Sequence, residues 1–242
     1  MAEQKVALVT GANKGIGKEI ARQLGAQGMT VLIGARDEGR GNEAAAELKG
    51  QGIDARAVRL DVTDEAGVGE AARQIERDFG RLDVLVNNAG IDLDGGRPTL
   101  LLDVDTLRRT YETNVFGVFA VTKALLPLLR KSEAGRIVNM SSGLGSLTEN
   151  SDPQGQYANV KPLAYNSSKA ALNMITVIFA AELNDTAIKV NAADPGYTAT
   201  DLNQHSGPRT VQQGATIAVR MATLPADGPT GGYFDEDGVV PW

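Results

Sequence analysis

A tyrosine and a lysine four positions apart are the clearest candidates for chemistry in this sequence. Tyr165 and Lys169 stand at the two ends of YNSSK, and a helix would place both side chains on one face. A free phenol, with a pKa of about 10, is a poor acid or base at neutral pH. A nearby ammonium favours the phenolate and lowers that pKa. The pair therefore predicts general acid–base catalysis by Tyr165.

A second tyrosine–lysine pair with the same spacing, Tyr157 and Lys161, lies just before the first. Pro162 follows Lys161 directly and biases that lysine away from helical backbone angles. Tyr165 instead leads into AALNMI, a good helix-forming segment. We therefore predict that Tyr165, and not Tyr157, is the reactive tyrosine.

A glycine-rich turn, TGANKGIG, follows the first apolar segment of the chain. Gly11 permits a tight turn, Gly15 lets the backbone approach a pyrophosphate, and Gly17 lets the next helix pack closely. The helix start offers free N–H groups and a positive dipole end to phosphates. The spacing is G-x-x-x-G-x-G, and its place between a strand and a helix favours a dinucleotide site over a purely structural turn.

The end of the second apolar segment indicates which dinucleotide would bind. In NAD-binding folds an acid at this point holds the ribose hydroxyls, but here Ala35 and Arg36 occupy it. Arg36, together with Lys14 in the glycine turn, suits a 2′-phosphate. Asp37 is interpreted as a helix cap. The sequence thus favours NADPH over NADH, with a solvated loop residue as the alternative for Arg36.

Short apolar segments alternate with amphipathic ones along the whole chain. Strands are expected over residues 6–9, 29–33, 55–60, 82–86, 136–140 and 188–193, and helices over residues 15–27, 42–49, 65–79, 104–130, 163–183 and 209–223. Strands that are apolar throughout and separated by helices indicate a parallel sheet covered on both faces. We expect one α/β Rossmann domain over residues 1–242, a doubly wound sheet of about seven strands, with the less apolar third strand near an edge. The polar segment 146–162 is expected to be a long loop.

Composition excludes several other classes of function. The chain has 242 residues and a net charge of −6, which disfavours binding to nucleic acid or an anionic membrane. It has no Cys, so thiolate and disulfide chemistry are absent, and one His, so no metal site is expected. That residue, His205, lies in a polar stretch typical of an exposed loop. Without a signal-peptide layout or a long apolar run, a cytoplasmic enzyme for a small molecule is expected.

Taken together, these motifs resemble the short-chain dehydrogenase/reductase family over essentially the full length of the chain, and within it the carbonyl reductases. The matching segments are TGANKGIG (10–17), Asp61-Val62, NNAG (87–90), TNVFG around Asn114, IVNMSSGLG around Ser142, YNSSK, DPGYTATDL and the tail PTGGYFDEDGVVPW. The resemblance implies a Rossmann fold and NADPH-dependent reduction of an aldehyde, ketone or ketoester to an alcohol.

The resemblance also implies the roles of individual residues. Tyr165 would give a proton to the carbonyl oxygen, and Ser142 would hydrogen-bond that oxygen. Lys169 would bind the nicotinamide ribose and lower the pKa of Tyr165, while Asn114 would hold a water that links Lys169 to solvent. Register with the family motif selects Ser142, with Ser141 as the alternative. Asn114 is also expected to bend its helix.

Further residues are expected to line the two binding sites. Those for the cofactor are Gly11, Asn13, Lys14, Gly15, Ile16, Gly17, Arg36, Asp61, Val62, Asn88, Ala89, Gly90, Tyr165, Lys169, Pro195, Gly196, Thr198 and Thr200. Asp61 and Val62 would flank the adenine, and Thr198 and Thr200 would contact the nicotinamide amide and the phosphates. Those for the substrate are Ser142, Leu144, Tyr157 and Tyr197, and the last three could equally be ordinary packing.

The spacing between Ser142 and Tyr165 differs from the family pattern. The two residues are 23 positions apart in this sequence, whereas about a dozen is usual in the family. The excess is interpreted as an insertion over residues 146–162. In related carbonyl reductases such an insertion covers a face that other members use to form tetramers, so a monomer and a homo-oligomer both stay open.

Two other functions remain as alternatives. One is a more specialised enzyme of the family, such as a ketoacyl-thioester reductase or a sugar or polyol dehydrogenase, although the acidic charge disfavours a carrier-protein partner. The other is a non-catalytic NADPH-binding sensor. The presence of Asn114, Ser142, Tyr165 and Lys169 together favours an enzyme.

Overall fold

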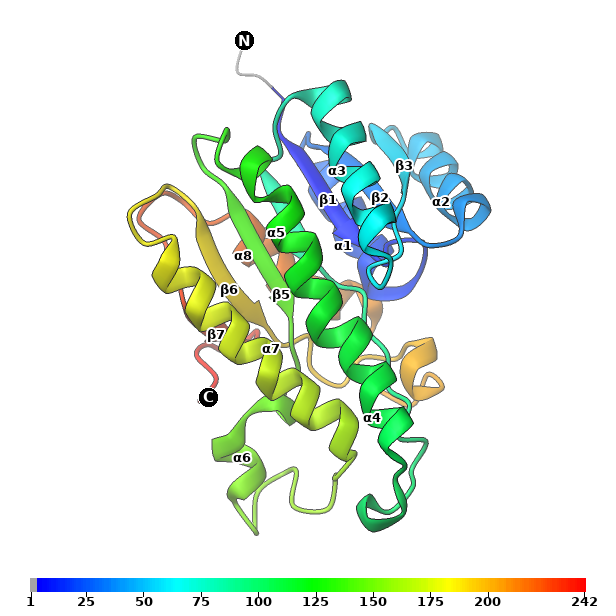
Figure 1. Cartoon of the computed structure of the whole chain (residues 1–242), viewed down its shortest axis with the longest axis vertical. Coiled ribbons are helices and arrows are strands. Elements are labelled where there is room, and N and C mark those ends of the chain that lie inside the picture. The colour runs from blue at the N-terminus through cyan, green and yellow to red at the C-terminus, as the bar shows by residue number, and fades with distance from the viewer. Residues whose placement is uncertain (1–3) are drawn as a thin grey trace.

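A seven-stranded parallel sheet forms the centre of the molecule in the computed structural model, which describes residues 4–242 (Figure 1). The strands are β1 (Val6–Thr10), β2 (Thr30–Ala35), β3 (Ala55–Arg59), β4 (Val84–Asn87), β5 (Arg136–Met140), β6 (Lys189–Ala193) and β7 (Tyr233–Phe234). Their order is β3-β2-β1-β4-β5-β6-β7. The α/β doubly wound fold is confirmed, and the third strand does lie at an edge.

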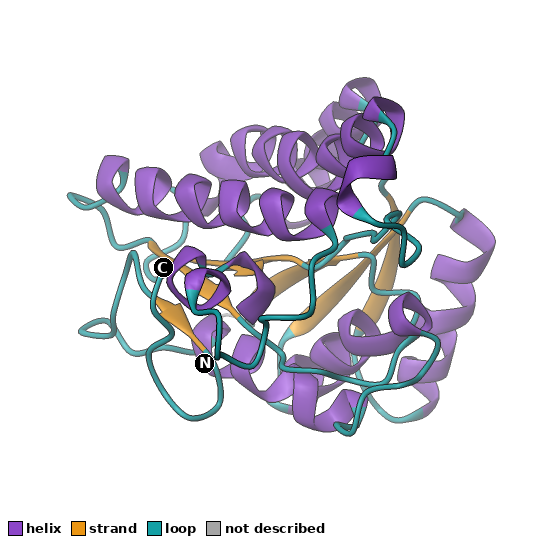
Figure 2. Ribbon diagram, turned by 90° about the horizontal axis from the view of Figure 1, so that it is seen from below, coloured by secondary structure: helices purple, strands orange, loops and turns teal. Residues whose placement is uncertain are grey.

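Helices cover both faces of this sheet (Figure 2). They are α1 (Gly15–Ala26), α2 (Glu38–Gly50), α3 (Glu65–Phe79), α4 (Val104–Tyr111), α5 (Gly117–Leu129), α6 (Leu147–Ser151), α7 (Leu163–Glu182) and α8 (Val211–Ala222). One apolar core joins the sheet to α1, α2 and α8. The other joins it to α3, α5 and α7. The central strands are buried along their whole length because both faces are covered.

The segment expected as one helix over residues 104–130 is interrupted. A π-helical turn, Glu112–Phe116, separates α4 from α5. Asn114 lies inside this turn, and its side chain bonds to the main chain of Ile91. The π-helical turn therefore lies where a polar side chain reaches across to the loop after β4, and such turns are frequent at functional sites.

The same stretch, Val104–Leu129, is long and apolar enough to cross a membrane by length and composition alone. Half of its most apolar window is buried inside the fold. A helix packed on the sheet of a globular protein meets the same criterion.

The expectation of a loop over residues 146–162 is partly wrong, since Leu147–Ser151 forms the short helix α6. The Ser146 side chain caps it by accepting a hydrogen bond from the Glu149 N–H. The chain end lies beside it, because the Trp242 carbonyl accepts hydrogen bonds from Thr148. Residues 146–162 thus form an ordered segment that lies below α7 (Figure 1). The short helix was not predicted because the segment is rich in Asn, Asp and Pro, which are typical of turns and loops.

Candidate active site

Several of the polar motifs directly follow strands, at the carboxyl ends of the parallel sheet. The glycine turn follows β1, NNAG follows β4, the two serines follow β5 and Asp194 follows β6. The chain leaves β1 and β4, which are neighbours, in opposite directions, toward β2 on one side and β5 on the other. Ligands of open α/β sheets bind in the crevice at such a point.

The tyrosine–lysine pair faces this crevice from α7. Lys169 is 4% exposed, its Nζ donates to the Met140 carbonyl at 2.7 Å, and Nζ lies 5.5 Å from the centroid of the Tyr165 ring. Burial lowers the pKa of Lys169 to about 8, an effect that the charge of Asp194 opposes. Burial is also the main reason why the pKa of Tyr165 is raised, with the charge of Asp194 adding to it. The lowered pKa expected from the neighbouring lysine is therefore not found, because burial outweighs it.

The two adjacent serines have different surroundings. Ser141 is 2% exposed and its hydroxyl donates to Asn173 Oδ1 at 2.6 Å, so it is used within the core. Ser142 is half-buried, and its hydroxyl lies close enough to Tyr165 to lower the phenol pKa. The structure therefore brings Ser142, and not Ser141, to the tyrosine.

The second tyrosine–lysine pair lies outside the helix that carries Tyr165 and Lys169, because α7 begins at Leu163. Lys161 is exposed. Tyr157, however, reaches back to the serine loop, since a Cβ added to Gly143 would lie 2.1 Å from its hydroxyl. Burial and the charge of Asp194 raise the pKa of Tyr157 to about 12. Tyr157 thus lies at the border of the site, but it has no lysine next to it on the same helix.

The other residues expected at the substrate wall lie farther out. Leu144 lines a cavity of about 310 Å³ between α6 and α7, together with Leu147, Leu163 and Asn166. Tyr197 is 58% exposed, and its hydroxyl pairs with Ser206 at 2.5 Å. Leu144 belongs to the loop that carries Ser142, since its N–H donates to the Ser142 hydroxyl at 3.3 Å. Tyr157 contacts this loop from outside.

Asn114 fixes the floor of the crevice. Its Oδ1 accepts from the Ile91 N–H at 2.9 Å, and its Nδ2 donates to the Ile91 carbonyl at 2.8 Å and to Ser168 at 3.0 Å. A Cβ added to Gly90 would lie 3.5 Å from both Asn114 Oδ1 and Lys169 Nζ. Asn114 therefore joins the β4 loop, the π-helical turn and α7 around the lysine.

Asp194, which the sequence motifs did not single out, is a buried acid at the centre of the site. It is 8% exposed, and it accepts hydrogen bonds from the main-chain N–H groups of Gly196 and Gly143. Burial raises the pKa of Asp194. Its charge acts on both Tyr165 and Lys169. The only sequence signal was its position before Pro195-Gly196.

The glycine turn has the geometry that a pyrophosphate needs. Gly11 and Gly15 have φ values of +63° and +56°, which L side chains rarely adopt. A Cβ at Gly17 would lie 2.4 Å from Asn88 Nδ2, because Asn88 clamps this turn by donating to the Thr10 carbonyl. Among the described residues no side chain caps α1, and its first turn holds no acid. The helix start is therefore suited to an anion, and the residues present fit a dinucleotide.

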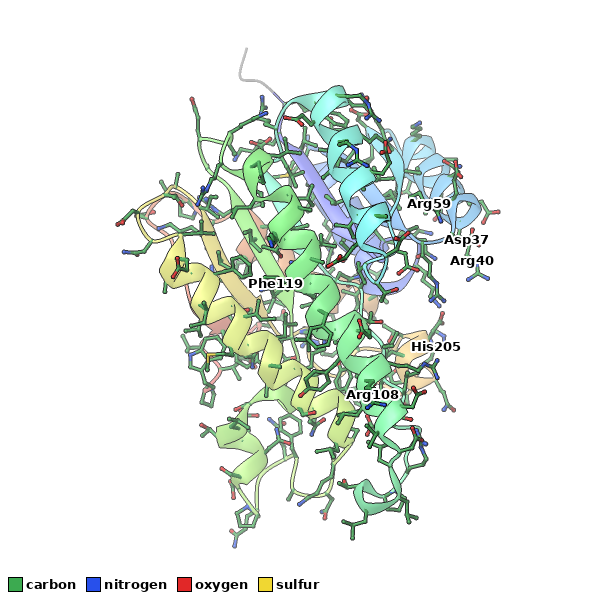
Figure 3. All side chains as sticks on the ribbon, in the orientation of Figure 1. Asp37, Arg40, Arg59, Arg108, Phe119 and His205 are labelled. Atoms are coloured by element: carbon green, nitrogen blue, oxygen red, sulfur yellow. The ribbon has the colours of Figure 1, made fainter. Side chains whose placement is uncertain are left out.

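A groove of about 500 Å³ beside this turn is lined by Asn13, Lys14, Lys18, Arg40, Glu47 and Asp201, among others. Lys14 pairs with Asp201 there. Arg40, on α2, was missed in the sequence analysis because it lies four residues beyond the expected phosphate ligand Arg36. Figure 3 shows Arg40 and Asp37 where α2 begins.

The neighbouring expectations can be placed as well. Arg36 is exposed between β2 and α2. Asp37 does cap α2, accepting from the Arg40 N–H at 2.9 Å. His205 is exposed, as expected, and its Nε2 lies 2.9 Å from Asp201 Oδ1.

The remaining expected cofactor residues lie along the same crevice. Val62 is buried against Gly117, and Asp61 accepts hydrogen bonds from Thr63. The Thr10 hydroxyl accepts from the N–H groups of Asn88 and Ala89, which holds NNAG in place.

The turn after β6 is fixed in a similar way. Thr198 is 3% exposed and donates to the Pro195 carbonyl, so its hydroxyl is used within the turn. Thr200 lies 3.9 Å from a Cβ added to Gly15, which places it beside the glycine turn.

Comparison with known proteins agrees with this geometry. The family model described as short chain dehydrogenase matches residues 5–210. Short-chain dehydrogenase/reductase 1 of Saponaria officinalis is 37% identical over an alignment of 296 residues, covering 100% of this chain and 97% of the relative.

Two solved structures are similar over nearly the whole fold. NADPH-bound carbonyl reductase from chicken fatty liver has a TM-score of 0.87 at 27% identity, covering 100% of both chains. Salutaridine reductase from Papaver somniferum has a TM-score of 0.84 at 31% identity, covering 96% of this chain and 100% of that one. The chain belongs to the short-chain dehydrogenase family and is an oxidoreductase that acts on C=O or CH–OH groups with a nicotinamide cofactor.

Proposed function

We propose that this protein is an NADPH-dependent carbonyl reductase that converts an aldehyde, ketone or ketoester into an alcohol. The observation that carries the proposal is the convergence of Ser142, Tyr165 and Lys169 beside the glycine turn. The Ser142 hydroxyl lies close enough to Tyr165 to lower its pKa, and the buried Lys169 ammonium lies close to the tyrosine ring.

Each of the four site residues has a separate role in the proposed reaction. The bound nicotinamide supplies the hydride to the carbonyl carbon. Ser142 orients the carbonyl oxygen by donating a hydrogen bond, and Tyr165 transfers its phenolic proton to that oxygen. Lys169 stabilises the phenolate that remains, and a water held near Asn114 in the π-helical turn returns a proton from solvent. The geometry of the site is set before substrate arrives, because Lys169 and Asn114 are already hydrogen-bonded.

The electrostatics of the site support an acid role for Tyr165. Burial and the charge of Asp194 raise its pKa, so the phenol keeps its proton near neutral pH. The positive charge of an oxidised nicotinamide bound beside Tyr165 would favour the phenolate and so help the phenol to give up its proton.

The basic groups beside the glycine turn support NADPH rather than NADH. Lys14, Lys18 and Arg40 line one groove, and Arg36 is exposed in the turn between β2 and α2. Within the groove Lys14 pairs with Asp201 and Lys18 with Glu47. Cations with several donors suit a doubly charged phosphate. The chicken carbonyl reductase with a similar fold was solved with NADPH bound.

We expect purified protein to oxidise NADPH, and NADH much more slowly, when it is given a panel of aldehydes, ketones and ketoesters. The rate is followed by loss of nicotinamide absorbance, and Kd is measured for both dinucleotides. Turnover of sugars or polyols with NADP⁺, but of no carbonyl, would instead indicate a polyol dehydrogenase. NADPH binding with no turnover of any compound in the panel would contradict the proposal and favour a sensor.

Replacing Asp194 by asparagine is expected to move the alkaline limb of the kcat/KM profile to lower pH. Reduction needs Tyr165 protonated and Lys169 charged, so activity falls as pH rises through their pKa values. The negative charge of Asp194 raises both pKa values. Asparagine removes this charge and lets both groups lose their protons at lower pH. The profile is measured with saturating NADPH between about pH 6 and 10, a range that brackets the pKa of Lys169, which is about 8.

The matched control is Asp237→Asn, which removes the same charge from an exposed position. Its alkaline limb is expected to coincide with that of the unmodified protein. An unchanged limb in Asp194→Asn, or a shift to higher pH, would show that Asp194 does not act on the proton donor.

A further inference from the structure

The helix that carries Tyr165 has no cap from its own sequence. Pro162 stands at its N-cap position and offers no side-chain acceptor. The first N–H groups of a helix nevertheless need partners. Here they are supplied by Asp94, about seventy residues earlier in the chain, whose Oδ1 accepts from the Ala164 N–H at 3.0 Å and whose Oδ2 accepts from the Tyr165 N–H at 2.9 Å. One carboxylate thus binds the main chain of the proposed acid itself.

Asp94 is in turn held firmly by the loop that contains it. It is 2% exposed, and its own N–H donates to Asp92 Oδ1 at 2.9 Å. Its carbonyl accepts from Arg97 Nε at 3.0 Å. Arg97 also donates to the Leu93 carbonyl and to Asp103, which caps α4. The Asp94 carboxylate therefore belongs to a turn that is held by hydrogen bonds, with Asp92 on one side and with Arg97 on the other.

We propose that Asp94 is a positioning residue for Tyr165. It holds the first turn of α7 so that the phenol stays in register with Ser142 and Lys169, and it couples the loop of residues 91–98 to the proton donor. The inference rests on the proposed function, in which Tyr165 is the acid. Asp94 lies in none of the motifs that identify the family, and it does not touch the reacting atoms.

The rest of the helix is anchored without Asp94, which makes its effect local. Lys169 is bound to the Met140 carbonyl, and Ser168 to Asn114, one turn after the tyrosine. Loss of the carboxylate therefore releases the turn that carries Tyr165 while Lys169 stays in place. The separation between donor and substrate then varies, and a displacement of about 1 Å can reduce a rate by about 100-fold.

The test compares Asp94→Ala and Asp94→Asn with the unmodified protein. We expect Asp94→Ala to lower kcat at least about tenfold while the Kd for NADPH stays within about twofold, because the glycine turn is untouched. Asp94→Asn keeps the size of the side chain and one acceptor, so it is expected to recover part of kcat. Hydrogen exchange of a peptide covering residues 163–168 is expected to become faster in both variants. If the alanine variant does not fold, the asparagine variant alone carries the comparison.

The control is Thr210→Ala, which removes the side-chain cap of α8, where the Thr210 hydroxyl accepts from the Gln213 N–H. It is expected to lose stability without losing kcat. The proposal is overturned if kcat in the Asp94 variants stays within about twofold, if residues 163–168 exchange unchanged, or if Thr210→Ala loses kcat equally. An unmodified protein that reduces no carbonyl would refute the proposed function instead. Hydrogen exchange would still decide whether Asp94 fixes this turn.

Discussion

Replacing Tyr165 by phenylalanine is expected to lower kcat by about 10² to 10⁴-fold, the usual contribution of a general acid. Phenylalanine keeps the ring and its packing but has no proton to give to the carbonyl oxygen. The Kd for NADPH is expected to stay within about twofold, because the phosphate site lies at the glycine turn. Single-turnover rates and fluorescence titration with NADPH measure the two quantities separately.

The control for this variant is already present in the sequence. Tyr157→Phe removes a hydroxyl that contacts the same serine loop but has no lysine beside it on a helix. It is expected to change KM more than kcat. Full activity in Tyr165→Phe, with loss of activity in Tyr157→Phe, would transfer the acid role to Tyr157.

Replacing Arg36 by alanine is expected to weaken NADPH binding by about 10 to 100-fold, the range for loss of a hydrogen bond to a charged group. NADH binding is expected to change by less than about twofold, because NADH has no 2′-phosphate to pair with the guanidinium. Arg40→Ala is expected to act in the same direction, since Arg40 lines the groove that also contains Lys14. Isothermal titration with both dinucleotides gives the two ratios.

Lys49→Ala provides the matched control, because Lys49 lies in the last turn of α2 at the end opposite Arg40. It is expected to leave both affinities unchanged. Equal weakening of NADPH and NADH by Arg36→Ala would mean that the guanidinium stabilises the loop and does not select the cofactor. A loss confined to Arg40→Ala would move the selection of NADPH from the loop to α2.

The local motifs of the sequence were sufficient for the architecture. Apolar strands alternating with helices determined the parallel sheet, because only a strand covered on both faces can be apolar throughout. The glycine turn could be located because its spacing fits a strand followed by a helix. Pro162 separated Tyr165 from Tyr157, since a proline restricts the residue before it whatever the tertiary context. Asp37 was identified as a cap for the same reason, as capping takes place within a few residues.

Only the tertiary structure could supply the contacts between segments far apart in the chain. Asp94 caps a helix about seventy residues later, and Asp194 binds the N–H of Gly143 in a loop that follows another strand. The π-helical turn at Asn114 depends on bonds to Ile91, which no helical periodicity reveals. Arg40 enters the phosphate groove because of the direction in which α2 leaves the sheet. Local sequence thus determined the strands, the longer helices and the position of the Tyr165–Lys169 pair. The surroundings that tune the pair depend on packing at the carboxyl edge of the sheet, where the ends of strands remote in sequence meet.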